Sequence, residues 1–190
     1  MRSTPAFVLA SASPRRQELL AAAGYDFTVH TADVDETPRP GEAPATYVAR
    51  LADAKARAVL ARRPDALVLG ADTTVVVDGD ILAKPADVAD AARMVGRLQG
   101  RAHEVLTGVA LVSAGWSRVA VAATTVWFAP MSAADIEAYV ASGEPMDKAG
   151  AYGIQGRAAR HVTRIEGSYS NVVGVPVALV HTLLAEYPGA

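Results

Sequence analysis

Strand-like and helix-like segments alternate along this chain, and two hairpins interrupt the alternation. Helices between strands indicate parallel crossovers, whereas the Asp78-Gly79 turn and residues 114–116 indicate antiparallel hairpins. The sequence therefore predicts an α/β fold in which a mixed, twisted sheet carries flanking helices. The expected strands are residues 7–10, 26–30, 67–77, 81–82, 105–113, 118–128 and 157–166. The expected helices are residues 14–23, 45–62, 87–98, 132–143 and 177–186.

Composition excludes several classes of protein. The 190 residues, 51% of them hydrophobic, suffice for one domain, with room for two lobes around a cleft. The absence of cysteine excludes disulfides, a thiol nucleophile and thiolate zinc sites, and the four histidines lack the spacing of zinc ligands. A net charge of -2 without basic tracts disfavours polymeric nucleic acid as a partner. No run has the length and apolarity of a membrane span, which favours a soluble cytoplasmic protein.

The first strand runs directly into a helix start that carries two arginines. Ser13 is a favourable N-cap residue, and Pro14 suits the first helical position. Unpaired backbone N–H groups at a helix start attract an anion, whereas Arg15 and Arg16 in that first turn oppose the helix dipole. Surface arginines also arise by drift. The combination nevertheless favours a phosphate-binding site over a purely structural helix start.

The chain has 18 basic residues, but only Lys55, Lys84 and Lys148 are lysines. Lysine offers a compact, mobile charge that suits phosphate oxygens or proton transfer, so lysine in an arginine-rich chain indicates a chemical requirement. Lys55 lies on an apolar helical stripe, seven residues after Val48, and is predicted to face inward. An inward lysine must snorkel to solvent, pair with an acid or contact a ligand. Lys84 precedes Pro85, which places it on a stiff loop.

Two carboxylates are candidates for metal binding or base catalysis. Asp72 interrupts the apolar run of residues 67–77, and a carboxylate there is costly to bury unless it binds a cation, pairs or acts as a base. A turn-forming aspartate is the alternative. Glu36 follows Asp33 and Asp35 in a loop bordered by prolines, where acids are commonly a solvated cluster. Together, Glu36 and Asp72 would supply the oxygen ligands that Mg²⁺ prefers.

Two glycine-rich segments near the end of the chain complete the candidates. Residues 142–156 combine glycines with Asp147, Lys148 and Gln155, and this composition suits a backbone wrapped close to a ligand as well as a turn-rich connection. Residues 167–176 join the last predicted strand to the closing helix. Asn171 there is expected to orient backbone or ligand, and a purely structural turn is the equal alternative. No nucleophile elbow, phosphate-binding loop of the Walker type or dinucleotide fingerprint is present.

These elements, in this order, resemble the Maf family of nucleoside triphosphate pyrophosphatases. The resemblance covers nearly the whole chain and implies a single Maf-like domain over residues 1–190. It implies a fold like that of the inosine-triphosphate pyrophosphatases, two lobes around a nucleotide cleft, and often a homodimer. The motifs that carry it are residues 11–16, 35–36, 54–56, 70–73, 84–85, 107–108, 143–145, 147–156 and 171–176.

The resemblance also implies the reaction: hydrolysis between the α- and β-phosphates of a nucleoside triphosphate, giving a monophosphate and pyrophosphate. In that reaction Glu36 and Asp72 would hold Mg²⁺ or Mn²⁺, and Asp72 would accept a proton from the attacking water. A metal-bound hydroxide assisted by a lysine is the alternative base. The groups expected to neutralise the triphosphate are Lys55, Lys84 and the helix start that carries Ser13 and Arg16. Ser11, Asp147 and Lys148 are expected to bind substrate.

The segment after Asp147 resembles the branch of the family that acts on dTTP, UTP and related modified pyrimidine nucleotides. Gln155 stands where the branch preferring 7-methylguanosine triphosphate usually has glutamate. A glutamine amide both donates and accepts, which matches the alternating edge of uracil or thymine, whereas a carboxylate only accepts. Arg15 and Thr73 resemble the other positions associated with base selection.

Two other functions stay open from the sequence. One is a nucleotide-binding regulator of cell division or septum formation, which would bind the nucleotide without hydrolysing it. The complete set of acids and lysines favours an enzyme, because a sensor needs no potential base beside the metal. The other is a 7-methylguanosine triphosphate pyrophosphatase, which Gln155 disfavours.

Overall fold

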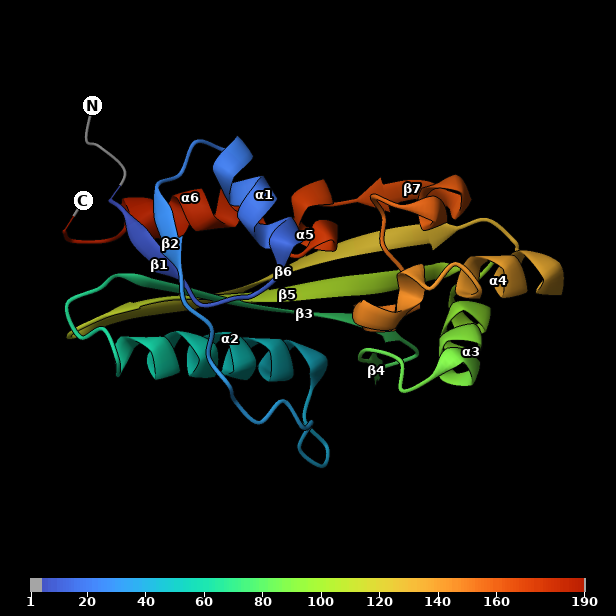
Figure 1. Cartoon of the computed structure of the whole chain (residues 1–190), viewed down its shortest axis with the longest axis horizontal. Coiled ribbons are helices and arrows are strands. Elements are labelled where there is room, and N and C mark those ends of the chain that lie inside the picture. Colours follow the sequence, from blue (N-terminus) through green and yellow to red (C-terminus); the bar gives the residue numbers. More distant parts are fainter. Residues whose placement is uncertain (1–4, 190) are drawn as a thin grey trace. The chain divides into compact units, whose positions relative to one another are not determined.

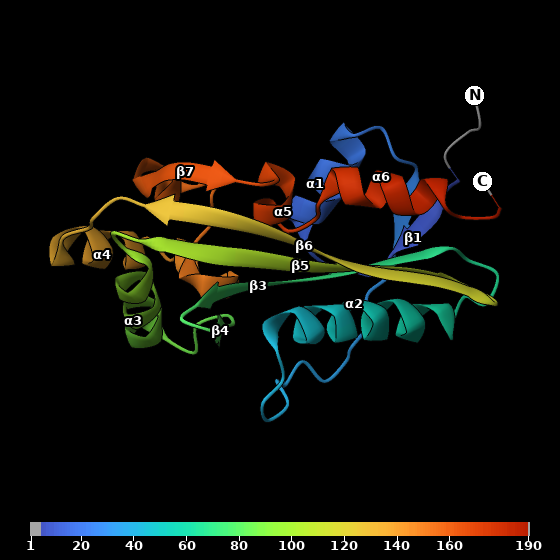
Figure 2. The ribbon, with the colours of Figure 1, turned by 180° about the vertical axis from the view of Figure 1, so that it is seen from behind.

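The computed structural model describes residues 5–189, which form a mixed α/β fold (Figures 1 and 2). The strands are β1 Phe7–Leu9, β2 Phe27–Val29, β3 Val68–Val77, β4 Asp80–Leu82, β5 Ala102–Ser113, β6 Trp116–Phe128 and β7 Val162–Glu166. The helices are α1 Pro14–Ala22, α2 Pro44–Leu60, α3 Val88–Leu98, α4 Ala133–Val140, α5 Tyr169–Val173 and α6 Val177–Ala185. Three short 3-10 helices are η1 Glu144–Asp147, η2 Ala149–Ala151 and η3 Arg157–His161.

The sheet contains parallel and antiparallel pairs, which confirms the predicted mixed architecture. Its strand order is β2-β1-β3-β5-β6-β7, and β4 also pairs with β3. β1 is parallel to both β2 and β3, with Val8 opposite Thr28 and Val68. The pairs β3–β4 and β6–β7 are antiparallel, and Val75 lies opposite Leu82 in the first of them.

The chain divides into two compact units, in agreement with the two predicted lobes. Unit 1 is Met1–Asp72, Thr107–Ala122 and Gly174–Ala190, and unit 2 is Thr73–Leu106 and Ala123–Val173. The nucleotide cleft and the single domain over residues 1–190 stay predictions. Within residues 5–189, no helix has both the length and the apolarity needed to cross a membrane.

Unit 1 buries both faces of β1 and of its parts of β3 and β5. Along β1, Phe7 and Leu9 point to one face and Val8 to the other, because successive side chains of a strand alternate. Helices α1 and α6 cover the first face, and α2 covers the second (Figures 1 and 2). Helices on both faces explain why β1 and these parts of β3 and β5 are continuous apolar runs rather than alternating ones.

Helix α2 lies unusually close to β3 and β5, because two glycines face it. A methyl group at Gly70 would collide with the Ala52 carbonyl oxygen and lie 2.9 Å from the Ala56 Cβ. A methyl group at Gly108 would collide with the Val48 carbonyl oxygen. The glycines therefore set the distance between sheet and helix, and α2 carries Lys55 at that distance.

We expect Gly70→Ala to destabilise the fold by about 1–3 kcal/mol, because the added methyl group forces α2 away from β3. Urea unfolding measures the free energy change. Gly96→Ala is the matched control: Gly96 lies inside α3, and a methyl group added there would have no atom within 4 Å, so alanine is expected to stabilise by roughly 0.5–1 kcal/mol. Equal effects of the two substitutions would contradict the close packing.

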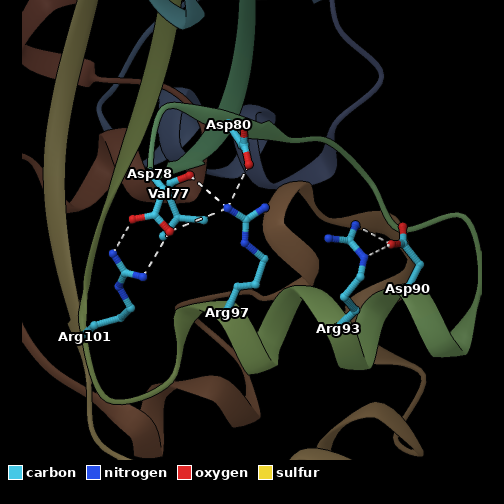
Figure 3. Close-up of polar contacts among 7 residues, drawn as sticks. All are labelled: Val77, Asp78, Asp80, Asp90, Arg93, Arg97 and Arg101. Atoms are coloured by element: carbon cyan, nitrogen blue, oxygen red, sulfur yellow. Dashed lines mark hydrogen bonds and ion pairs between the residues drawn. The ribbon is translucent and has the colours of Figure 1, made fainter.

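Unit 2 carries the β3–β4 hairpin and helices α3, α4 and α5. The hairpin turn uses left-handed backbone at Asp78 and Gly79, as the Asp-Gly pair predicts. Arg101 and Arg97 bind the turn: the Arg101 Nη1 and Asp78 Oδ2 are 3.0 Å apart, and the Arg97 Nη2 and Asp80 Oδ2 are 2.9 Å apart (Figure 3). These exposed pairs fix the turn's geometry more than they add stability.

The structure differs from the sequence-based prediction between residues 157 and 173. The prediction of a strand over residues 157–166 is wrong for its first half, because residues 157–161 form the 3-10 helix η3. Only the second half is extended, as β7. Helix α5 was not predicted, because its five residues are too few for a helical period to be visible. The side chain of Ser13, at the predicted N-cap of α1, makes no capping hydrogen bond within the described residues.

Candidate functional site

A buried lysine of unit 1 holds two carboxylates together. The Lys55 Nζ lies 2.6 Å from the Asp72 Oδ1 and 2.6 Å from the Glu36 Oε1. The Lys55 and Asp72 side chains are only 11% and 9% exposed, whereas Glu36 is 53% exposed. The inward direction predicted for Lys55 is thus confirmed, and of the three options for an inward lysine the structure shows pairing with acids.

Asp72 is a carboxylate in the middle of a buried strand. Burial raises its pKa, and this effect outweighs the opposing attraction of Lys55 and Arg16, while the negative charge of Glu36 adds to the increase. A raised pKa brings a carboxylate closer to the range in which a general base works at neutral pH. The environment of Asp72 is therefore suited to accepting a proton.

Arg16 points from the first turn of α1 into unit 1. Its Nε donates to the Gly174 carbonyl oxygen at 2.7 Å, and its Nη1 donates to the Ser11 Oγ at 3.0 Å. Ser11 Oγ also accepts from the Ser13 backbone N–H at 3.3 Å. Burial lowers the Arg16 pKa, although the nearby Asp72 carboxylate opposes that change. The guanidinium is thus held by backbone and hydroxyl groups with Asp72 close enough to attract it.

The neighbouring Arg15 is half-buried, and its positive charge also lowers the Arg16 pKa. Two guanidinium groups that repel each other gain from a bound anion, because it neutralises both. This geometry is consistent with the phosphate site expected at the start of α1.

Tyr47 is a site residue that the sequence analysis missed. Its hydroxyl donates to the Glu36 backbone carbonyl at 3.0 Å and so anchors the loop that carries Glu36. Burial, followed by the negative charges of Asp72 and Glu36, raises the Tyr47 pKa to about 12. The sequence could have indicated Tyr47 through its spacing from Lys55. The two residues are eight positions apart on α2, which is about two helical turns along one face.

Glu36 and Asp72 fit a hard divalent cation. Their carboxylates converge on a single ammonium group, so a cation between them would meet one oxygen from each. Among residues 5–189, no cluster of three or more histidine, cysteine or acidic side chains could hold a metal. Two carboxylates still suit Mg²⁺, which commonly takes one or two from the protein and its other ligands from water and phosphate.

The remaining predicted residues belong to unit 2. Lys148 is engaged by the protein, because its Nζ donates to the Asp147 Oδ1 at 2.6 Å and to the Glu144 carbonyl oxygen at 2.7 Å. Lys84 and Gln155 are exposed on loops, and Thr73 is half-buried. The structure thus brings together Ser11, Arg16, Glu36, Lys55 and Asp72 in unit 1, and Asp147 and Lys148 in unit 2.

Asn171 orients backbone, one of the two roles that the sequence left open. Its Nδ2 donates to the Val105 carbonyl oxygen at 3.0 Å and to the Thr124 Oγ1 at 2.9 Å. The sequence did not predict another buried polar contact of unit 2, in which the His103 Nε2 and the Tyr152 hydroxyl are 2.8 Å apart. Burial lowers the His103 pKa to about 4, so the imidazole is neutral at pH 7. Both pairs stabilise the interior of unit 2.

Comparison with known proteins decides the family. A family model described as Maf-like protein matches residues 6–187. The chain belongs to the Maf family. The resemblance inferred from its motifs is therefore confirmed, and this Maf-family chain can be compared with its relatives.

Several relatives match this Maf-family chain over almost its whole length. A protein of Symbiobacterium thermophilum is 56% identical over 95% of this chain and 93% of its own. Relatives from Moorella thermoacetica and Vibrio cholerae are 57% and 51% identical, over 94% and 95% of this chain and 93% and 97% of their own. All three are named dTTP/UTP pyrophosphatase. Among solved structures, the Ham1 protein of Staphylococcus aureus matches 65% of this chain and 72% of its own, with 16% identity and a TM-score of 0.47.

Proposed function

We propose that this chain hydrolyses dTTP and UTP between the α- and β-phosphates, releasing a nucleoside monophosphate and pyrophosphate. The observation that carries the proposal is the identity of about half of all residues to relatives that are named for this activity. The cluster of Lys55, Asp72 and Glu36 supports it, because hydrolysis of a phosphoanhydride needs a base and cationic groups in one place.

In this proposal Asp72 accepts a proton from the attacking water. Its raised pKa favours that role, since a carboxylate with an ordinary pKa is a weak base at pH 7. Lys55 keeps Asp72 oriented through the 2.6 Å hydrogen bond and brings a positive charge to the same place. In unit 1, Asp72 would thus accept the proton that leaves water, and Lys55 would stabilise the negative charge that develops on the phosphate oxygens.

Glu36 and Asp72 would hold the divalent metal, Mg²⁺ or Mn²⁺. When bound, the metal supplies positive charge that stabilises the triphosphate oxygens and lowers the pKa of coordinated water. Lys55 contacts both carboxylates, so its own positive charge lies beside the residues that would hold the metal.

Cationic and hydroxyl groups would bind the triphosphate. Arg16 is fixed by Gly174 and Ser11, so its guanidinium needs little further ordering to contact a phosphate. We assign triphosphate binding to Ser11, Ser13, Arg16, Lys55, Lys84 and Lys148, and a less specific substrate-binding role to Asp147. For base selection we retain Arg15, Thr73 and Gln155. A homodimer stays a prediction from the family resemblance, and a cytoplasmic location stays a prediction from the sequence.

Gln155→Glu is expected to lower kcat/KM for UTP by about tenfold, because a carboxylate cannot donate a hydrogen bond to the base. The free energy of unfolding should change by less than roughly 0.5 kcal/mol, since Gln155 is exposed. Steady-state kinetics and urea unfolding measure both quantities. Gln99→Glu is the matched control. It makes the same charge change in the same unit, and its side chain keeps the oxygen that accepts a hydrogen bond from the Met131 backbone N–H. An unchanged UTP profile in Gln155→Glu would remove Gln155 from base recognition.

Product analysis tests the reaction itself. The protein is incubated with dTTP and Mg²⁺ or Mn²⁺, and the products are separated by anion exchange. Monophosphate with pyrophosphate is expected; diphosphate with inorganic phosphate would place cleavage at the wrong bond. Tight binding without any turnover would support the alternative, a nucleotide-binding regulator of cell division.

A further inference from the structure

Glu144 of unit 2 contacts both ends of the segment that carries Gln155, the Arg157 end through its carboxylate and the Lys148 end through its backbone carbonyl. The Glu144 Oε1 accepts from the Tyr139 hydroxyl at 3.1 Å, and the Glu144 Oε2 accepts from the Arg157 backbone N–H at 2.8 Å. The Glu144 carbonyl oxygen accepts from the Lys148 Nζ at 2.7 Å. Through these contacts Glu144 ties residues 148 and 157, on either side of Gln155, to helix α4.

The segment runs close to the Glu144 and Lys148 side chains at two of its glycines, Gly153 and Gly156. A methyl group at Gly156 would collide with the Glu144 carboxylate, and one at Gly153 would lie 2.6 Å from the Lys148 Cε. The Gly153 backbone N–H also points at the Tyr139 hydroxyl, 3.4 Å away. The backbone on both sides of Gln155 is therefore shaped around these side chains.

A glutamine at position 144 would replace one of the two acceptor oxygens by a donor. Both oxygens of the Glu144 carboxylate accept a hydrogen bond, and an amide has only one oxygen to offer. Burial, and then the charge of Glu144, raises the Tyr139 pKa, so the Tyr139 hydroxyl keeps its proton and remains a donor. Tyr139 is only 5% exposed, so water cannot easily replace the lost acceptor.

We propose that Glu144 is a positioning residue for base recognition: it fixes the backbone on either side of Gln155 and thereby sets the affinity for the pyrimidine nucleotide. This proposal rests on the proposed function, since it assigns Gln155 to the base. Lys148, to which we also assign triphosphate binding, adds a second support to the same segment through the Glu144 carbonyl oxygen.

The test compares Glu144→Gln with Asp90→Asn. Asp90 is a matched control because it is also half-buried in unit 2 and accepts a backbone N–H, that of Ala86 at 3.1 Å, outside the segment. We expect Glu144→Gln to raise KM for dTTP and UTP by about tenfold while kcat changes by less than about twofold. Asp90→Asn should keep the wild-type KM.

Hydrogen–deuterium exchange of the Gly153 and Arg157 amides gives a second readout that does not depend on activity. Both amides should exchange faster in Glu144→Gln and at the wild-type rate in Asp90→Asn. If Glu144→Gln does not fold, Tyr139→Phe takes its place: it removes only the hydroxyl, and the Gly153 amide should exchange faster with a matching rise in KM.

An unchanged KM in the variant would overturn the proposal, as would a fall in kcat at constant KM. Failure of the proposed function would look different, because the wild-type protein itself would then not turn over dTTP or UTP. In that event amide exchange alone decides whether Glu144 holds the segment: protection that is equal in wild type and variant would overturn the positioning role.

Discussion

Asp72→Asn is expected to lower kcat for dTTP and UTP by about a hundredfold or more while the protein stays folded. Asparagine has the shape of aspartate and its oxygen still accepts from the Lys55 Nζ, but it cannot take a proton from water. Burial disfavours the negative charge of Asp72, so removal of that charge should not destabilise the fold severely. Steady-state kinetics and thermal unfolding measure the two effects.

The control for that experiment is Asp53→Asn, which removes an aspartate of α2 paired with Arg57 at 2.7 Å. The exposed pair contributes little, so both activity and stability should stay near the wild-type values. If Asp72→Asn retains most of its activity, Asp72 is structural and the base must be sought elsewhere.

Lys55→Met is expected to lower the free energy of unfolding by about 3–5 kcal/mol at pH 7, because it leaves the buried Asp72 carboxylate without its main partner. Methionine fills a similar volume, so the cost reflects charge rather than a cavity. Without Lys55 the Asp72 pKa rises further above its ordinary value. The folded state then binds a proton more tightly than the unfolded state, so the penalty is full above the folded-state pKa and shrinks as pH falls through it.

Urea unfolding at several pH values between about 4 and 8 measures this dependence, and Lys84→Met, on an exposed loop, is the control. A pH-independent loss in Lys55→Met would contradict the account, since it would mean that packing rather than an unpaired carboxylate causes the destabilisation.

The sequence predicted most strands and helices because their signals are local. The apolar stripe of α2 placed Lys55 inside the fold, and the Asp-Gly turn located the β3–β4 hairpin. Residues 157–161 were misassigned because the run into β7 was treated as uniform. Arg157, Ala158 and Arg160 have no β-branched side chains, whereas Val162, Thr163 and Ile165 in β7 do.

The site was harder to predict where it depends on loops. Asp72 stood out as a charge within an apolar strand, but Glu36 looked like one of several solvated acids. Its contact with Lys55 depends on a loop path that Tyr47 fixes from α2. Glu144 belongs to the motif of residues 143–145, but its role was not visible because it comes from a contact with the Arg157 backbone, 13 residues away along an irregular segment.

A competition experiment tests the central claim most directly. Equal concentrations of dTTP, UTP, CTP, GTP, ATP and 7-methylguanosine triphosphate are incubated in one tube with the wild-type protein and Mg²⁺ or Mn²⁺, and the remaining nucleotides are followed by chromatography. The account predicts that dTTP and UTP disappear first, each replaced by its monophosphate and pyrophosphate. First consumption of the methylated guanosine nucleotide would contradict the role given to Gln155, and survival of all six nucleotides would contradict the proposed activity.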